Sequence, residues 1–181
     1  MKITETSLPG VLLITPAIYR DSRGAFQETF NGRQMAQAGL PTEWPQDNFS
    51  VSKKDVLRGI HYQITQPQGK LVRVTQGAVL DVAVDLRRTS ANFGRHFSVQ
   101  LDSEKGEMLW IPAGFGHAFL ALTDDAGFSY KVTDYYSPAG ERTILWNDPD
   151  LAIPWPIDSD KVIVSDKDRQ GAPLRDAEVF A

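Results

Sequence analysis

The amino-acid sequence predicts an all-β protein, an antiparallel sandwich or barrel with few short helices. The first observation is a period of two in the apolar residues. In Ala78–Arg87, one parity carries only apolar side chains, and the other carries Asp81 and Asp85, which is typical of a strand with one apolar face. The second observation is that many short runs of this kind follow one another at near-regular spacing, separated by Gly, Pro, Asp or Ser.

The individual elements can be predicted in chain order from the same signals. A short helix is expected from Asn31 to Gly39, because an Asn N-cap precedes it and a Gly follows it. From Pro154 the chain is expected to cover the sheet as extended segments and turns. The predicted strands are Ala25–Phe30, Asn48–Ser52, Val56–Gln63, Lys70–Thr75, Ala78–Arg87, His96–Leu101, Met108–Ile111, Ala118–Leu122 and Phe128–Tyr136.

Length and composition favour one domain spanning residues 1–181 and exclude several classes of function. The chain has no cysteine, which excludes disulfides, thiolate metal sites and a thiol nucleophile, and fits a cytoplasmic protein. A net charge of -4 argues against sequence-independent binding to nucleic acid. No apolar run approaches the roughly 20 residues that span a membrane, and the N-terminus does not read as a signal peptide.

The segment "IPAGFGHAFLAL" (Ile111–Leu122) contains Pro-x-Gly-x-x-His followed by apolar residues. This pattern resembles the second conserved motif of cupins, which are double-stranded jelly rolls. The first motif then corresponds to "GIHYQ", with the single histidine His61 where metal-binding cupins have two. A three-histidine site requires His96, whose surroundings match no motif. A metal-free pocket is therefore expected.

A longer set of motifs resembles the dTDP-4-dehydrorhamnose 3,5-epimerase family of metal-free cupins. The matching stretches include "FSVSKKDVLRGIHYQ", "LWIPAGFGHAFLAL" and "YKVTDYYSPAGERTILWNDPDLAIPWP", and the resemblance runs from about Gly10 to Leu174. It implies a cupin jelly roll that binds a dTDP-4-keto-6-deoxy sugar and epimerises C3 and C5. Such chemistry needs a base, an opposing acid and a group that stabilises the enolate. It requires no cofactor, and the sequence has no Gly-rich dinucleotide-binding loop.

The resemblance also implies roles for the catalytic residues. His61 is the expected base, since an unperturbed pKa of about 6.5 suits proton abstraction at neutral pH. Asp168, in "SDKD", is expected to bond the other ring nitrogen. Lys70 corresponds to the cation near the enolate oxygen. Tyr130 corresponds to the proton donor opposite His61. Strand parity places Tyr130 and Tyr136 on one face of Phe128–Tyr136.

Further residues are expected to bind the nucleotide part of the substrate. Arg58 corresponds to a pyrophosphate ligand, because a planar guanidinium suits paired phosphate oxygens. In a regular strand Arg58 and His61 face opposite sides, so we predict a bulge or bend at Gly59. The family also exchanges N-terminal strands across a homodimer, so some of these residues are expected to serve the partner's pocket. The other expected substrate-binding residues are Arg23, Glu28, Gln46, Asp47, Asn48, His117, Tyr136, Glu141 and Lys167.

Three alternatives remain open from the sequence. A relative that epimerises only C3 or only C5 shares the His61, Asp168 and Tyr130 set. A non-catalytic sugar-nucleotide-binding cupin is expected to lack one of these three residues, whereas this chain has them all. A metallocupin is disfavoured by the single histidine of the first motif.

Overall fold

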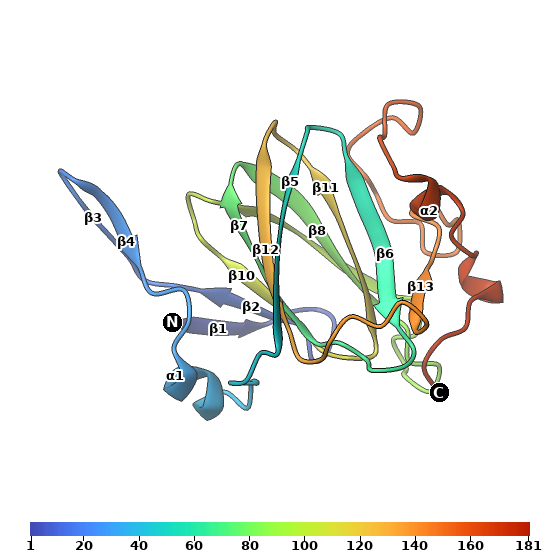
Figure 1. Cartoon of the computed structure of the whole chain (residues 1–181), viewed down its shortest axis with the longest axis horizontal. Coiled ribbons are helices and arrows are strands. Elements are labelled where there is room, and N and C mark those ends of the chain that lie inside the picture. The colour runs from blue at the N-terminus through green and yellow to red at the C-terminus, as the bar shows by residue number, and fades with distance from the viewer.

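The computed structural model describes residues 1–181 and consists of two facing antiparallel sheets (Figure 1). The six-stranded sheet has the order β1-β2-β10-β7-β12-β5, and the five-stranded sheet has the order β13-β6-β11-β8-β9. The first comprises β1 (Lys2–Glu5), β2 (Leu12–Thr15), β10 (Met108–Ile111), β7 (Lys70–Gln76), β12 (Ala126–Val132) and β5 (Gln46–Ser52). The second comprises β13 (Glu141–Thr143), β6 (Leu57–Gln63), β11 (Phe115–Ala121), β8 (Ala78–Asp85) and β9 (His96–Asp102).

The remaining elements lie outside these two sheets. A hairpin of β3 (Ile18–Asp21) and β4 (Gly24–Gln27) projects away from the body of the molecule (Figure 1). The helices are α1 (Gly32–Gln37), α2 (Asp166–Arg169) and the 3₁₀ helix η1 (Leu174–Asp176). The predicted N-cap of α1 is confirmed, because the Asn31 side chain accepts from the N–H groups of the first turn. No helix has the length and apolar character needed to cross a membrane.

The core between the sheets is apolar and draws on both of them. Phe128 and Val72 come from the six-stranded sheet, and Phe119 and Ala83 come from the five-stranded sheet. Phe119 and Phe128 stack with their ring centroids 4.2 Å apart. These contacts hold the sheets together by removing apolar surface from water.

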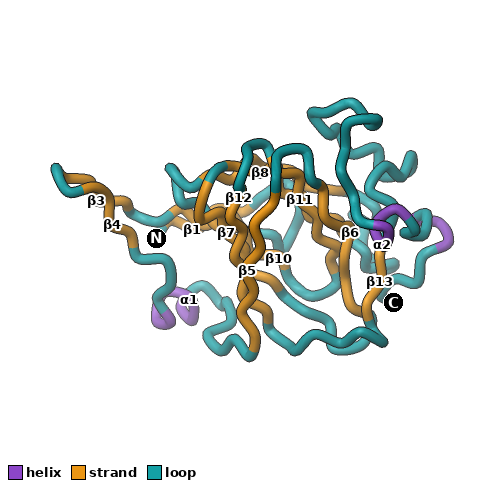
Figure 2. The backbone as a smooth tube through the Cα atoms, turned by 45° about the horizontal axis from the view of Figure 1, so that its top comes forward, coloured by secondary structure: helices purple, strands orange, loops and turns teal.

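The outer face of the five-stranded sheet is covered by the C-terminal segment, as the sequence predicted. The prediction of extended segments and turns alone is wrong, because this segment also contains α2 and η1. Val82 and Val84 of β8 pack there against Leu151 and Leu174. Figure 2 shows the C-terminal loops folding back beside β6 and β13, with α2 among them. The apolar parity of Ala78–Arg87 therefore faces this segment, while the opposite parity points into the barrel.

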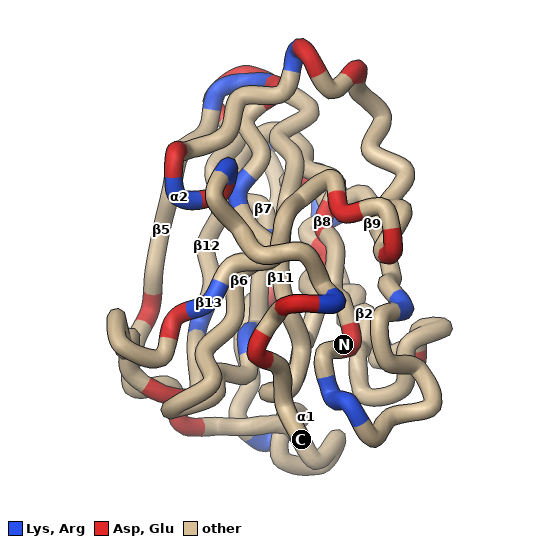
Figure 3. Tube along the Cα trace, turned by 90° about the vertical axis from the view of Figure 1, so that its right-hand side faces the viewer, with Lys and Arg blue, Asp and Glu red and all other residues tan.

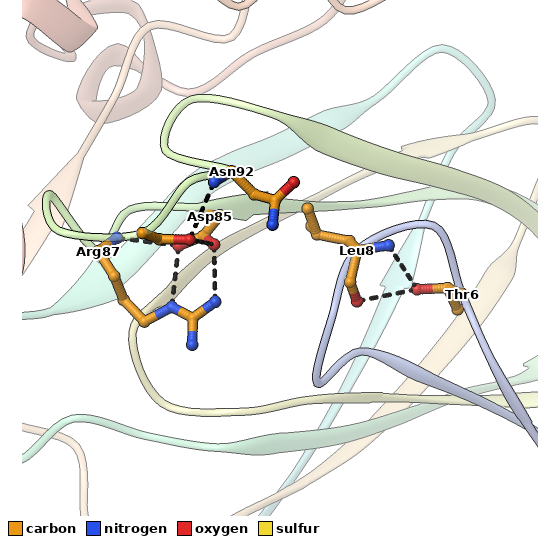
Figure 4. A network of polar contacts seen from close by, with 6 residues as sticks. Thr6, Leu8, Asp85, Arg87 and Asn92 are labelled. Atoms are coloured by element: carbon orange, nitrogen blue, oxygen red, sulfur yellow. Dashed lines mark hydrogen bonds and ion pairs between the residues drawn. The ribbon is translucent and has the colours of Figure 1, made fainter.

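The carboxylates of β8 are consequently buried, although the sequence placed them on the polar parity. Asp81 and Asp85 are both fully buried. Asp85 accepts hydrogen bonds from the Arg87 guanidinium at 2.7 and 3.0 Å (Figure 4). It also accepts from Ser90 Oγ at 2.7 Å. Burial opposes the ionisation of Asp85, but these bonds outweigh it and hold the pKa of that carboxyl below its ordinary value.

The predicted strand Phe128–Tyr136 is wrong at its C-terminal end. β12 ends at Val132, and the Thr133 N–H turns to the Gly69 carbonyl. Tyr136 therefore lies in a loop, and strand parity does not determine where its side chain points. The predicted strand Ala25–Phe30 likewise ends early, at Gln27, because the chain turns toward the cap of α1.

The predicted irregularity at Gly59 is confirmed. His61 of β6 lies opposite His117 of β11, and Arg58 lies opposite Phe119, so three steps along β6 match two steps along β11. Gly59 has φ +114°, a conformation that favours glycine, and its peptide bond to Ile60 is cis. The extra residue turns Arg58 and His61 toward the same side of the sheet.

The bulge predicts that Gly59→Ala destabilises the protein. A Cβ at this position would lie 2.5 Å from the His117 carbonyl oxygen and 2.7 Å from the Ala118 Cβ. Positive φ and overpacking together should lower the free energy of unfolding by about 2–4 kcal/mol in urea titrations. Gly32→Ala is the control, since its Cβ would have no neighbour closer than 3.9 Å. Equal stability of the two variants would contradict the prediction.

Candidate active site

A cavity of about 520 Å³ opens between the two sheets and the C-terminal segment. Arg58 and His61 reach it from β6, and Tyr130 reaches it from β12 in the other sheet. Its size and its mixture of apolar walls with a few polar groups suit a small-molecule site. The charged and polar side chains that line it are Ser50, Arg58, His61, Lys70, His117, Tyr130, Glu141, Ser165, Lys167 and Asp168.

His61 is oriented by a buried carboxylate. Its Nε2 makes a short hydrogen bond to Asp168 Oδ1, and Asp168 is only 2% exposed. Burial opposes the ionisation of Asp168, but the hydrogen bond and the charge of His61 outweigh it and lower the pKa of the carboxyl. An ionised carboxylate on one nitrogen stabilises the imidazolium and leaves Nδ1 free to take a proton.

Local structure fixes Asp168 in this position. Ser165 caps the short helix α2, and its Oγ accepts from the Asp168 N–H at 3.1 Å. The Gly59 N–H, exposed by the bulge, points at Asp168 Oδ2 at 3.5 Å. The bulge therefore helps to position the Asp168 carboxylate as well as the His61 ring. Figure 3 shows charges of both signs along α2.

Tyr130 and Lys70 come from the six-stranded sheet, opposite His61. Burial raises the pKa of Tyr130, so its phenol keeps its proton at neutral pH. Burial lowers the pKa of Lys70 to about 8, although the nearby carboxylates of Glu141 and Asp81 act in the other direction. A lysine with this pKa is still mostly charged at pH 7.

A second histidine–carboxylate pair faces the same cavity. His117 Nε2 lies 2.9 Å from Asp81 Oδ2, and the His117 ring stacks on Phe128 at a centroid distance of 5.8 Å. The other oxygen of Asp81 has no hydrogen-bond partner. His117 was predicted from its motif, whereas Asp81 was not predicted, because it alternates with apolar residues on the face of the strand that was expected to face solvent.

A smaller cavity of about 250 Å³ continues from the first and shares His61, Lys70, Tyr130 and Glu141 with it. Tyr136 reaches this cavity from its loop, and its hydroxyl donates to Glu141 Oε2 at 2.8 Å. Lys167 forms an ion pair with Glu141. Burial opposes the ionisation of Glu141, but Lys167 and Tyr136 outweigh it and lower the pKa.

Gln46 and Asn48 of the edge strand β5 complete the smaller cavity. Gln46 accepts from the Tyr136 N–H at 2.8 Å and donates to Asn48 Oδ1 at 2.9 Å. Arg58 is held from the same strand, since its Nε donates to Ser52 Oγ at 3.1 Å. Ser52 was not predicted, because nothing in the neighbouring sequence indicates that this serine of an edge strand is buried. Ser165 was not predicted either, although the pattern Ser-x-x-Asp is a helix-capping signal.

Three predicted site residues lie elsewhere in the chain. Arg23 pairs with Asp21 at 2.6 Å on the projecting hairpin. Glu28 accepts from Asn31 Nδ2 at 3.1 Å at the start of α1. Asp47 points away from Gln46 and pairs with Lys131 at 2.7 Å. Within one chain, these residues do not join the cavity.

The histidines do not form a common metal site. His61 and His117 each bond a carboxylate, whereas His96 lines a separate cavity with Ser7, Arg95 and Leu151. The structure holds no group of three or more His, Asp or Glu side chains placed to bind a metal ion. A histidine hydrogen-bonded to a carboxylate, faced by a protonated tyrosine across a barrel, is an arrangement suited to an enzyme that transfers protons.

Comparison with known proteins identifies the family. The profile of dTDP-4-dehydrorhamnose 3,5-epimerase matches residues 5–176, and the chain belongs to this family of isomerases. It is 50% identical over 181 residues to the dTDP-4-dehydrorhamnose 3,5-epimerase of Pseudomonas aeruginosa, and the match covers 99% of each chain.

Solved structures agree with this assignment. The dTDP-6-deoxy-D-glucose-3,5-epimerase of Legionella pneumophila, solved with dTDP-4-keto-L-rhamnose, superposes with a TM-score of 0.94 at 44% identity, covering 98% of this chain and 94% of the other. A 3'-monoepimerase of Streptomyces bikiniensis, solved with dTDP-quinovose, gives 0.89 at 40% identity, covering 94% and 86%. The predicted cupin-type all-β fold is confirmed.

The burial of Lys70 predicts an unusual titration. We expect its ammonium to lose its proton with a midpoint near pH 8, because burial lowers the pKa to about 8, whereas exposed lysines titrate at about 10.4. Carbon-13 NMR of labelled lysine side chains measures the midpoint, and Lys70→Met assigns the signal. A Lys70 midpoint above pH 10 would show that the ammonium is solvated.

Proposed function

We propose that this protein epimerises C3 and C5 of dTDP-4-dehydro-6-deoxy-D-glucose, giving dTDP-4-dehydro-L-rhamnose. The observation that carries the proposal is the His61–Asp168 pair placed across the cavity from a protonated Tyr130. Both epimerisations are proton transfers at carbons next to one carbonyl. A single base and a single acid on opposite faces of the sugar therefore serve each step.

The proposed reaction assigns one task to each group. His61 Nδ1 takes the proton from the carbon beside the C4 carbonyl, and Asp168 balances the imidazolium charge. The electron pair of the broken C–H bond moves to the carbonyl oxygen, where the Lys70 ammonium stabilises the enolate. When the carbonyl re-forms, the carbon takes the Tyr130 proton on the opposite face, which inverts the centre. Solvent restores both groups.

The smaller cavity is proposed to hold the nucleotide part of the substrate. Arg58 and Lys167, which line the adjoining larger cavity, offer two cations for the pyrophosphate. Tyr136 presents an exposed aromatic ring beside Gln46, which suits stacking on a base. His117, Asn48 and Glu141 are proposed to contact the substrate between these two ends.

A homodimer is part of the proposal. The projecting hairpin exposes Tyr19 and Phe26 at 66% and 69%, and the edge strand β5 exposes Phe49 and Val51. Exposed apolar side chains on an unpaired strand edge are typical of an interface. We propose that the hairpin of each chain packs on its partner and brings Arg23 and Glu28 to the partner's cavity, with Asp47 at the interface. The cytoplasmic location and the lack of a cofactor stay predictions.

The alternative of epimerisation at one carbon has its own support, since a 3'-monoepimerase is among the structural neighbours. His61, Asp168 and Tyr130 serve one carbon or two equally well. The distinction therefore depends on how the sugar turns in the cavity, and the test must follow the two carbons separately.

Proton exchange in D2O tests the proposed function and separates it from the alternative. We expect both the C3 and the C5 hydrogens of the 4-keto sugar nucleotide to be replaced by deuterium, as followed by proton NMR. Exchange at one carbon alone supports a monoepimerase. No exchange, in folded protein that binds dTDP, would support a non-catalytic binding protein.

The same assay assigns the base and the acid. His61→Asn should abolish exchange and leave dTDP affinity largely intact. Tyr130→Phe should slow turnover about 10²–10⁴-fold, the usual contribution of a general acid. Tyr135→Phe, which removes an exposed hydroxyl that lines neither cavity, is the control. Loss of dTDP binding in His61→Asn would instead indicate a structural histidine.

Complementation between inactive variants tests the exchange of hairpins. Arg23→Glu and His61→Asn should each be inactive alone. If Arg23 serves the partner, a mixed dimer contains one intact site, and random mixing restores about a quarter of wild-type activity. Co-expression with two purification tags isolates the mixed dimer. If mixed dimers stay inactive, Arg23 does not act across the interface.

A further inference from the structure

Gln63 is a buried amide that the proposed reaction does not use. It ends the β6 run that carries Arg58 and His61, and it is only 4% exposed. Its side chain makes three hydrogen bonds, all to loop backbone. Nε2 donates to the carbonyls of Gln66 at 2.8 Å and Tyr135 at 3.2 Å, and Oε1 accepts from the Ser137 N–H at 2.9 Å.

These bonds join two loops that deliver site residues. Residues 64–69 lead directly into Lys70, and residues 133–140 carry Tyr136 toward Glu141. Gln63 bonds the carbonyl of the residue before Tyr136 and the N–H of the residue after it. The backbone of Tyr136 is therefore clamped on both sides by one side chain.

Other contacts also join the two loops, but none of them bonds the residues on either side of Tyr136. The Thr133 N–H donates to the Gly69 carbonyl at 3.0 Å, and the Ile64 N–H donates to the Gly140 carbonyl at 2.8 Å. The Gln68 amide donates to the Asp134 carbonyl at 2.9 Å, and the exposed Gln66 amide reaches Asp134 Oδ1 at 3.3 Å. Water competes for the bond of the exposed Gln66 amide, so that bond contributes little to the loop's position. The buried Gln63 amide, with its nitrogen and its oxygen both bonded, holds its partners more firmly.

We propose that Gln63 is a positioning residue that fixes the Tyr136 loop against the loop leading to Lys70, and so sets the affinity for the nucleotide half of the substrate. The inference rests on the proposed function of the smaller cavity. Only an amide supplies two N–H donors and one acceptor at this length. A carboxylate at position 63 would face two carbonyl oxygens with no proton to offer.

The first test separates binding from chemistry. Gln63→Met keeps the length of the side chain and removes all three bonds. The dissociation constant for dTDP and the KM should rise about tenfold, equivalent to one or two lost hydrogen bonds, while kcat changes less than about threefold because His61 and Tyr130 sit on strands. Gln66→Ala, which removes an exposed amide from the same loop, should change neither constant more than about twofold.

The conservative variant Gln63→Glu adds a second measurement, the pH dependence of dTDP affinity, which would not change if Gln63 only stabilised the fold. Gln63→Glu should bind dTDP poorly at pH 8 and approach the wild-type affinity as the pH falls toward about 5. Burial against two carbonyl oxygens raises the pKa of the new carboxyl, and its protonated form regains a donor. Calorimetry of the variant and the wild type at each pH gives the ratio of affinities. A ratio independent of pH contradicts the proposal.

Hydrogen exchange makes the test independent of catalysis. Gln63→Met should lose protection at the Ser137 amide, and Gln66→Ala should retain it. Wild-type protein that neither binds dTDP nor exchanges substrate protons defeats the proposed function, while exchange at Ser137 still reports on the clamp. Active wild type together with unchanged dTDP affinity and KM in Gln63→Met overturns the positioning role.

Discussion

A β-strand alternates its side chains between two faces, yet this cavity needs Arg58 and His61, three positions apart on one strand, to face the same way. The extra residue at Gly59 meets that requirement. It also frees a backbone N–H that points at Asp168, so one irregularity arranges the histidine, the arginine and the carboxylate. Because the His117 carbonyl lies against this glycine, even a methyl group would disturb both strands.

The cavity is built from elements of unequal rigidity. Three of the side chains, those of His61, His117 and Tyr130, lie on strands that are each hydrogen-bonded to a neighbouring strand on both sides. Asp168, Lys167 and Tyr136 come from loops or a short helix, and each is tied down by a specific polar contact. The proposed reacting end of the site thus draws mainly on the sheets, and the proposed nucleotide end draws on β5 and β6 as well as on loops.

Much of the fold followed from the sequence, because alternation and turn residues are local signals. The helix at Gly32–Gln37 and most strand positions were predictable for this reason. What alternation could not reveal was which face of Ala78–Asp85 points into the barrel. The tail covers the face that is more apolar, so Asp81 turned out to be interior. The depth at which a residue lies depends on packing by segments distant in sequence.

The site residues that belong to family motifs could be predicted from the sequence. Residues that act through contacts with distant parts of the chain could not. Resemblance supplied His61, Lys70, Tyr130 and Asp168, and the cavity brings them together. Asp81, Ser52 and Gln63 act on neighbours through contacts that no local pattern encodes. Arg23 and Glu28 lie outside the cavity of a single chain, and only the proposed dimer brings them to a cavity.

The pairing of His61 with Asp168 spans 107 positions of the chain. During synthesis, the barrel strands leave the ribosome well before the segment that carries the carboxylate. A chain cut before Asp166 loses this carboxylate together with Leu174, which packs on the five-stranded sheet. The orientation of His61 and the cover of that sheet therefore depend on the same C-terminal segment.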